Sequence, residues 1–536
     1  MIIATALSAA LCTSAADPNV PTEKVVRVTD FGALPDGISN NVAAIARATA
    51  RCVELRGCTL VFPPRARARA HAHASDPVSE FEGTPYPTVY RTSSFRVPSN
   101  TTVWVPAGVQ LRGTESDAVN LNASVWPVQP RVESPMAPCM SCPYACGGGC
   151  GPTKRAWIFV QNATNVTITG GGSLHGGGAW WWCARADNKQ HRPLHCSSTM
   201  RLQNMCAPRM IHVLGSRAVK IHGLDIRWSP FWTLHVQLSR DIEIFNISVL
   251  NPHNTSYSAP NGDGIDVSSS KNVHVHDVIL DVSDDATAVR AGSGWAGRLA
   301  VAGAGAAATG FGGRCATEDI VFERLTVRNG HSVGRCGEDI TGGIRNVTWR
   351  DIVVNGAGPV QRGDLPPHVV RFEVNPTDGG AFERITFERI SGEHVRSAFS
   401  FMMNHATYLP NTTSGGSTAY PPRVPGAPFP PLAPVAPVLR NIVVRDVHVS
   451  SMTGAASLDM PTKGSTRALG NFFTLRNAPV VNLTLHNITL LPVAARAGAG
   501  WTCAAASSQG QVFACNASVV NVTPPLLHPK GCALVC

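Results

Sequence analysis

Residues 261–285 read Asn-Gly-Asp-Gly-Ile-Asp-Val-Ser-Ser-Ser-Lys-Asn-Val-His-Val-His-Asp-Val-Ile-Leu-Asp-Val-Ser-Asp-Asp, a strand-like stretch with carboxylates at both ends. Between Asp263 and Asp284, hydrophobic residues alternate with polar ones, which is typical of a strand with one buried face. A coil with turns of roughly twenty residues would stack Asp284 above Asp263, at the strand spacing of about 4.8 Å. The stretch therefore predicts a stacked coil that brings several carboxylates together.

The same short strand phrase recurs along most of the chain. Its copies begin at Asn165, Ala218, Asp241, Asn272, Asp319, Asn346, Arg384, Asn441 and Asn482. The intervals are 53, 23, 31, 47, 27, 38, 57 and 41 residues, which we interpret as single turns of a coil, double turns and turns with inserted loops. One phrase per turn, without helical crossovers, indicates an all-β solenoid of the parallel β-helix type more than a sandwich or a propeller.

Composition agrees with an all-β chain organised as one long domain. Of 536 residues, 49 are Gly and 40 are Pro, and only 15% are charged, which favours strands and turns over solvated helices. We expect the coil to span residues 17–495, with insertions near 64–95, 127–156, 293–318 and 404–437. Residues 496–536 are expected to form a Cys-bearing C-terminal cap.

One helix is predicted near the N-terminus. Apolar residues recur at helical spacing over residues 40–56, Ser39 is a candidate N-cap and Gly57 can end the helix. Its apolar face could cover the open end of the coil and block edge pairing. An ordinary surface helix is the alternative.

Several features favour secretion. Residues 1–16 form an apolar run that ends in small residues, as in a signal peptide. Sixteen cysteines include close pairs suited to disulfides, namely Cys52/Cys58, Cys315/Cys336, Cys503/Cys515 and Cys532/Cys536. The Asn-x-Ser/Thr motifs predict glycosylation. No apolar run is long enough to predict a membrane span.

A compact cysteine group leaves two interpretations open. Cys139, Cys142, Cys146 and Cys150 could form two local disulfides or hold a structural zinc ion. Secretion favours the disulfides.

Six phrases resemble the polygalacturonase-type glycoside hydrolases, family 28. They are Val28-Thr-Asp-Phe-Gly-Ala, Trp228-Ser-Pro-Phe-Trp-Thr-Leu-His, Asn261-Gly-Asp-Gly-Ile-Asp, Ser283-Asp-Asp, Gly330-His331 and Gly342-Gly-Ile-Arg-Asn-Val. They occur in the family's order between about residues 25 and 400. The resemblance implies a right-handed parallel β-helix.

The resemblance also implies roles for individual residues. Asp284 would be the general acid, and Asp263 and Asp285 would activate the attacking water in an inverting reaction. His331 would orient or tune the acid. Arg371 would hold the sugar at the cleaved position. The motif that contains Asp263 begins with Asn261, which we assign to substrate binding.

The proposed chemistry has a physical basis of its own. Crowded carboxylates cannot all ionise easily, so at least one pKa rises and a protonated acid is retained near neutral pH. Carboxylates one turn apart lie near the ~5 Å typical of retaining enzymes, whereas inversion usually needs ~6.5–9.5 Å. We expect no cofactor and no catalytic metal. Of the tryptophans before the site, Trp181 in the cluster 180–182 is the candidate for stacking on sugar.

Other functional classes remain open. A silent carbohydrate-binding or cell-wall protein could use the same scaffold, and β-helices also host polysaccharide lyases. Formation of reducing ends without an unsaturated product would separate hydrolysis from both. The expected partner is a polysaccharide or oligosaccharide, with no nucleic acid and no membrane, and the protein is expected to be a monomer.

The substrate prediction comes from a departure from the family. Where galacturonate-cleaving members have Arg-Ile-Lys, this chain has Arg371-Phe-Glu373. A carboxylate would repel a uronate, so we expect plain polygalacturonate to be a poor substrate and Glu373 to accept hydrogen bonds from a neutral sugar. The alternative is that Glu373 points away and that Arg298 or Arg314 pairs with the uronate.

Overall fold

The computed structural model describes most of the coil. The described residues are 24–65, 86–129, 153–184, 207–252, 259–292, 315–338, 340–355, 367–374, 380–402, 437–452, 470–473, 480–492, 501–503, 511–512, 514–515, 518–523 and 532–533. The predicted signal peptide and Cys139, Cys142, Cys146 and Cys150 lie outside these residues, as do most of the predicted insertions.

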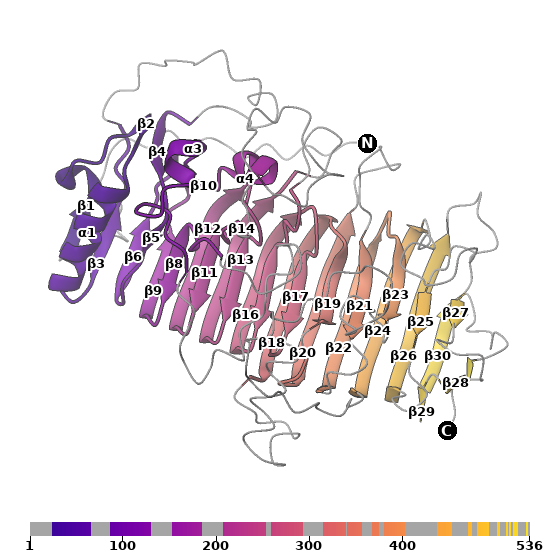
Figure 1. The fold of residues 1–536 in the computed structure, drawn as a ribbon. Helices are drawn as coiled ribbons and strands as arrows, with labels where there is room; N and C mark the ends of the chain where they lie inside the picture. Colours follow the sequence, from indigo (N-terminus) through magenta and orange to yellow (C-terminus); the bar gives the residue numbers. More distant parts are fainter. Residues whose placement is uncertain are drawn as a thin grey trace, which may run out of the picture.

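The molecule is a right-handed parallel β-helix, in which strands run side by side along one axis (Figure 1). Sheet A contains β1 Val25–Arg27, β2 Asp36–Asn40, β3 Cys58–Val61, β4 Thr88–Thr92, β6 Thr101–Trp104, β7 Val109–Gly113, β9 Thr164–Thr169, β10 Ser173–His175, β12 Arg217–Arg227, β14 Arg240–Leu250, β16 Lys271–Asp281, β18 Thr317–Asn329, β20 Ile344–Asn355, β22 Ala381–Glu393, β24 Val438–Met452, β26 Val480–Pro492, β29 Ala514–Cys515 and β30 Ser518–Thr523.

A second sheet forms another wall of the coil. Sheet B contains β5 Phe95–Arg96, β8 Ile158–Gln161, β11 Ile211–Leu214, β13 Leu234–Gln237, β15 Ile265–Ser268, β17 Thr287–Arg290, β19 Ser332–Glu338, β21 His368–Val374, β23 Ser397–Met402, β25 Gly470–Phe473 and β27 Trp501–Cys503. β28 Gln511–Val512 pairs with β31 Cys532–Ala533. Strand pairing thus continues beyond residue 495, where we expected the coil to end, because β27 extends sheet B and β30 pairs with β26.

The nine phrases stack directly on one another. Their second residues are register partners from Val166 through to Leu483. Every interval between phrases is therefore one turn, and the expected double turns are absent from this part of the chain. The variable lengths come from segments placed between the two sheets.

The first residue of each phrase has a backbone reason to be polar. All nine adopt positive φ, between 52° and 58°, and seven of them are Asn or Asp. These residues tolerate the left-handed conformation better than most others. They also bond along the stack, since Asn272 donates to Asp241 at 2.7 Å and Asn346 to Asp319 at 2.7 Å.

Apolar side chains fill the interior of the coil. The stacked positions Val219, Ile242, Val273, Ile320 and Val347 are buried, as alternation along the strands requires. The indole of Trp349 stacks between Phe322 and Phe387, with ring centroids 5.1 and 4.5 Å away. The core is one continuous column, which fixes the position of each turn relative to the next.

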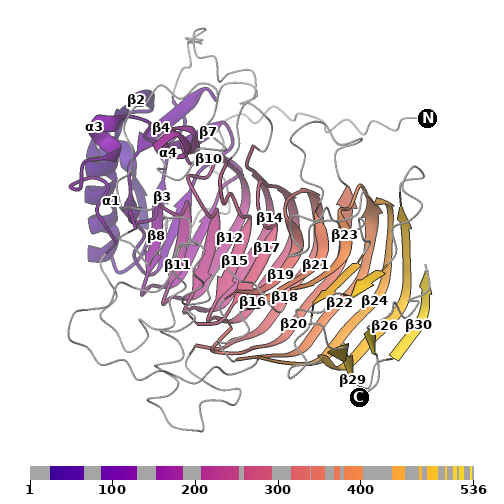
Figure 2. The same cartoon turned by 45° about the vertical axis from the view of Figure 1, so that its right-hand side comes forward.

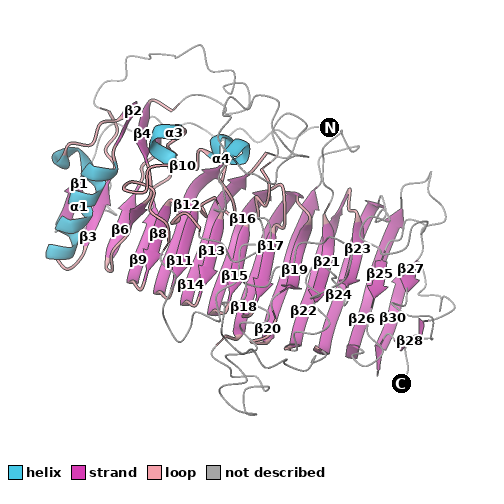
Figure 3. Cartoon of the chain, viewed as in Figure 1, coloured by secondary structure: helices cyan, strands magenta, loops and turns pink. Residues whose placement is uncertain are grey.

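Helix α1, Val42–Glu54, covers the N-terminal end of the coil as predicted (Figure 2). It buries Ala44, Ile45, Ala48 and Cys52, and begins after Asn41 rather than Ser39. The Cys52–Cys58 disulfide joins it to β3. The other short elements are the 3-10 helix η2 Val28–Phe31 and the helices α3 Asp117–Asn120 and α4 Gly178–Ala184 (Figure 3). Among the described residues, no helix is long and apolar enough to span a membrane.

The predicted pair Cys315/Cys336 is wrong. Cys336 is a free, buried thiol, whereas Cys315 is disulfide-bonded. Cys336 lies on the interior side of β19, where burial raises the pKa of its thiol. The pairs Cys503/Cys515 and Cys532/Cys536 involve side chains outside the described part of the chain.

Candidate active site

The candidate site lies where the chain enters sheet B on successive turns. Ile265 in β15 is the register partner of Thr287 in β17, and Gly264 N donates to Asp285 O at 2.9 Å. One turn here is 22 residues, so the register aligns Asp263 with Asp285 rather than with Asp284 as we expected. Asp284 directly precedes Asp285 in the sequence and is therefore one residue out of register with Asp263.

The three carboxylates nevertheless converge. One oxygen from each of Asp263, Asp284 and Asp285 lies within 4.8 Å of the others. Side-chain exposure differs among them, at 2% for Asp263, 17% for Asp284 and 1% for Asp285. Asp284 is therefore the carboxylate that solvent or a substrate can reach most easily.

Asp284 is held by its neighbours. Asn261 Nδ2 donates to Oδ2 at 3.3 Å, and the backbone N–H of Asp285 donates to Oδ1 at 2.9 Å. His331 N donates to the Asp284 carbonyl at 2.9 Å. This approach needs a residue without Cβ at Gly330, whose φ is 150° and where a Cβ would come within 2.7 Å of that carbonyl.

His331 completes this part of the site. Its Nδ1 lies 3.1 Å from Asp284 Oδ1, and its side chain is 37% exposed. Burial alone would lower the pKa of His331, but the adjacent Asp284 outweighs burial and raises it above the ordinary value. The pair can therefore hold a proton beside the most accessible carboxylate.

Two arginines and Glu373 lie next to Asp285. Arg335 Nη1 is 3.1 Å from Asp285 Oδ2, and its other terminal nitrogen pairs with Glu373. Arg371 Nη1 is 3.6 Å from Asp285 Oδ1, and Arg371 also pairs with Glu373. Ser332 Oγ donates to Asp285 Oδ1 at 2.6 Å. Two buried anions are thus balanced by two cations.

This arrangement corrects the expected role of Glu373. Its side chain is 1% exposed and is engaged by Arg335 and Arg371, so it is not positioned to accept hydrogen bonds from a sugar. The alternative, that Glu373 points away from the substrate, agrees with this burial. Arg298 and Arg314, its suggested replacements, lie outside the described residues.

The pKa values of the aspartates shift in opposite directions. Burial raises the pKa of Asp263 well above its usual range, and the charges of Asp266, Asp284 and Asp285 add to the effect. Burial also opposes ionisation of Asp284, but His331, Arg335 and Arg371 together bring its pKa down to about 2. These opposite shifts favour the proton on Asp263 and the negative charge on Asp284.

A second buried charge group adjoins Asp263. Arg290 Nη2 is 3.9 Å from Asp263 Oδ2, and Arg290 also pairs with Asp266. Burial raises the pKa of Asp266 to about 6, although Arg290 acts in the opposite direction. The Arg290 guanidinium lies 4.4 Å from the centre of the Trp232 ring, a cation–π contact.

Trp181 does not take its expected place. It lies in α4, not on a strand, and is fully buried against Trp126, with ring centroids 5.0 Å apart. No face is left for a sugar. Its neighbour Trp180 is half-buried and donates from Nε1 to Asp117 at 2.7 Å.

The sequence analysis missed Arg335, Arg290 and Asp266 as members of this site. Arg335 could have been noticed as a charged residue in a strand that follows the Gly-His phrase. Its pairing with Asp285 and Glu373 depends on lateral register, which the sequence does not supply. The three carboxylates could together hold a cation, but Arg335, Arg371 and Arg290 already neutralise much of their charge.

Comparison with known proteins agrees with this geometry. Residues 148–362 match the model of glycosyl hydrolases family 28. This range contains Asp263, Asp284, Asp285 and His331 and ends before Arg371. A probable polygalacturonase of Vitis vinifera is 25% identical over 418 residues, which are 75% of this chain and 69% of that protein.

Over residues 148–362, the chain is similar to glycosyl hydrolases family 28. Solved structures of similar proteins agree on the fold. An exopolygalacturonase of Thermotoga maritima superposes with a TM-score of 0.57 at 18% identity, covering 89% of this chain and 90% of that one. An endo-xylogalacturonan hydrolase of Aspergillus tubingensis superposes with a TM-score of 0.55 at 14% identity, covering 92% of this chain and 100% of that one. The family match and the relatives support O-glycosyl hydrolase activity for this chain.

Proposed function

We propose that the protein is a secreted enzyme that hydrolyses glycosidic bonds in a pectin-type polysaccharide. The observation that carries the proposal is the convergence of Asp263, Asp284 and Asp285 within 4.8 Å, with His331 against Asp284. Several relatives are named polygalacturonases, which supports a pectic substrate.

Asp284 is assigned as the general acid because it is the most exposed of the three carboxylates. In the free protein it is ionised, so it must acquire a proton before the glycosidic bond breaks. Two groups hold protons nearby, namely Asp263 and His331. Transfer of the Asp263 proton to Asp284 would leave Asp263 ionised, so that it could activate water together with Asp285.

Inversion is the stereochemical outcome that we assign. The carboxylate oxygens lie closer together than the ~6.5–9.5 Å usual for inverting enzymes, so this assignment rests on the family resemblance. In the proposed arrangement, Asp263 and Asp285 hold water on the far side of the acid. Proton NMR of the first product settles the outcome: an anomer with the substrate's configuration would refute inversion.

The sugar at the cleaved position is proposed to be neutral. Asp285, Glu373, Arg335 and Arg371 form a group with equal numbers of positive and negative charges, which leaves no net positive charge for a uronate. Arg371 is 13% exposed and is the member of this group best placed to touch a sugar. Xylose, rhamnose and galactose are the neutral candidates in a pectic polymer.

The test is a substrate panel assayed with the parent protein and with Asp284→Asn. Removing a general acid should lower turnover by at least about a hundred-fold without unfolding the protein. A variant that keeps more than a tenth of the activity would place the acid elsewhere. Brisk cleavage of unsubstituted polygalacturonate by the parent would refute the neutral-sugar assignment alone, whereas an unsaturated product would indicate a lyase.

Secretion has its own support and its own test. Cys52 and Cys58 form a disulfide, and Cys183 and Cys315 are also disulfide-bonded. Asn162 and Asn246 are exposed and begin Asn-x-Ser/Thr motifs. Expression in a eukaryotic secretory host should give a glycosylated protein in the medium. An intracellular, unmodified product with free thiols would contradict secretion.

A further inference from the structure

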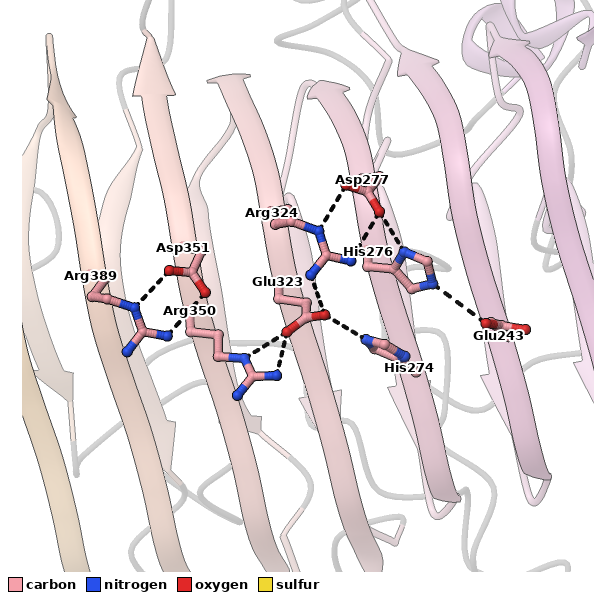
Figure 4. A network of polar contacts seen from close by, with 9 residues as sticks. All are labelled: Glu243, His274, His276, Asp277, Glu323, Arg324, Arg350, Asp351 and Arg389. Atoms are coloured by element: carbon pink, nitrogen blue, oxygen red, sulfur yellow. Dashed lines mark hydrogen bonds and ion pairs between the residues drawn. The ribbon is translucent and has the colours of Figure 1, made fainter.

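The outer face of sheet A carries a group of histidine and carboxylate side chains, whereas the three aspartates lie beside strands of sheet B (Figure 4). His274 and His276 lie two residues apart on β16, so both side chains project from the same face. Glu243 on β14 is the register partner of His274, and Glu323 on β18 is the register partner of His276. The proposed function uses none of these residues.

We infer that Glu243, His274 and His276 form a binding site for a divalent transition metal ion, with Zn²⁺ as the best match. One potential ligand atom from each residue lies within 4.8 Å of the other two. His276 Nε2 is 3.5 Å from Glu243 Oε1. Two imidazoles and one carboxylate are an established zinc donor set, which leaves the fourth position for water.

Asp277 already holds the imidazole of His276 in one orientation. Its Nδ1 lies 2.6 Å from Asp277 Oδ2, and Asp277 is held by Arg324 through contacts of 2.9 and 3.0 Å. A carboxylate that accepts the Nδ1 proton fixes the ring and leaves the Nε2 lone pair available for a metal. In that tautomer, Nε2 and Glu243 Oε1 are two acceptors facing each other, and a cation between them would turn this contact into coordination.

Small movements are sufficient to close the site. Zinc bonds of about 2.0–2.1 Å in a tetrahedron place ligand atoms roughly 3.4 Å apart, so the widest pair must approach by a little over 1 Å. His274 is 42% exposed and Glu243 34% exposed, which leaves space on the solvent side for both side chains to move. A groove of about 360 Å³ that includes Glu243, His274 and Lys220 gives the ion access from solvent.

Neighbouring side chains compete with the metal. Lys220 Nζ lies 2.7 Å from Glu243, and His274 Nε2 lies 3.0 Å from Glu323. Glu323 is also paired with Arg324 and Arg350. Lys220 contacts Oε2 of Glu243, whereas Oε1 faces His276, so the positive charge of Lys220 opposes a cation at this carboxylate. Lys220→Ala should therefore strengthen zinc binding several-fold. The bound ion would join β14 to β16, two consecutive turns of the coil.

Zinc titration calorimetry and thermal unfolding with and without Zn²⁺ test the inference. The double variant His274→Ala/His276→Ala should lose one zinc equivalent and the zinc-dependent rise in Tm, whereas His448→Ala, an exposed histidine on β24, should keep both. X-ray absorption should show nitrogen and oxygen ligands. Sulfur ligands would indicate the cysteine group at 139–150 instead. Unchanged zinc stoichiometry in the double variant, or no zinc-induced rise in Tm in the parent, would overturn the inference.

Discussion

At the scale of single residues, the site depends on charge balance more than on any one carboxylate. Asp285 and Glu373 are each 1% exposed, and both are paired with Arg335 and Arg371. Removing one member of a buried ion pair leaves an uncompensated charge, which typically costs about 3–5 kcal/mol. Stability and pH dependence must therefore be measured together for variants of this group.

Arg335→Gln should move the acidic limb of the pH profile of kcat/KM to higher pH. Arg335 is one of the cations that hold the pKa of Asp284 near 2. Its loss should raise this pKa, so that Asp284 takes up a second proton for the cluster at a higher pH than in the parent. Arg335→Gln/Glu373→Gln restores the charge balance and should show a smaller shift with a higher Tm than the single variant. If Arg335→Gln kept the parent's pH profile while losing stability, Arg335 would have only a structural role.

His331 should contribute stability that depends on pH. Because the folded-state pKa of His331 is raised, the contribution is fully present below the ordinary histidine value of about 6.5 and is lost as the pH rises through the higher folded value. The Tm difference between the parent and His331→Asn should be largest near pH 5.5, below that value of about 6.5, and should shrink in alkaline buffer. A difference that grows with pH would contradict the Asp284 contact, and His448→Asn serves as an exposed control.

At the scale of elements, the strand phrases were predictable because their pattern is local. Alternation of apolar residues and a leading Asn or Asp both arise within a few residues, and all nine phrases stack as one ladder. Lateral pairing was less predictable. A one-residue difference in turn length aligned Asp285, not Asp284, with Asp263. The pairing of Arg335 with Glu373 depends on the register of β19 with β21, which the sequence does not supply. Trp181 was misjudged for a related reason, because a helix buries side chains that a strand would expose.

The stack of first residues of the phrases leads to a prediction at Ala218. Among these nine residues, Ala218 is the one that has positive φ although it is neither polar nor Gly. Left-handed conformation costs most L-residues roughly 1–2 kcal/mol, whereas Asn tolerates it better. Ala218 is exposed and is stacked between Asn165 and Asp241, both of which can hydrogen bond. Ala218→Asn should therefore raise the unfolding free energy by about 0.5–1 kcal/mol. Asn272→Ala, which removes the bond to Asp241, should lower the unfolding free energy. A denaturant titration in which Ala218→Asn lowered this free energy, or Asn272→Ala raised it, would refute the ladder argument.

At the scale of the whole molecule, a continuous parallel coil has two ends, and each presents unpaired strand edges and open core. The sequence predicted the helix that covers the N-terminal end because its apolar spacing is local, and the structure confirms it. The C-terminal limit was misplaced because strands β27 and β30 lack the full phrase but still find partners in β25 and β26. A segment that pairs with an existing strand needs a weaker alternation of apolar and polar residues than a segment that starts a sheet.

The N-terminal cap should control both stability and association. Ile45 in α1 is fully buried against the end of the coil, so Ile45→Ala should cost about 2–5 kcal/mol of unfolding free energy. Weakened docking exposes the edge of β1 that faces away from β3, and this edge can pair with the same edge of another molecule. Size-exclusion chromatography should show more self-association for the folded variant than for the parent. Val53→Ala changes the same helix at a position 61% exposed and should alter neither property. If Ile45→Ala eluted at the same volume as the parent while losing the expected stability, α1 would stabilise the end of the coil without acting as a barrier to edge pairing.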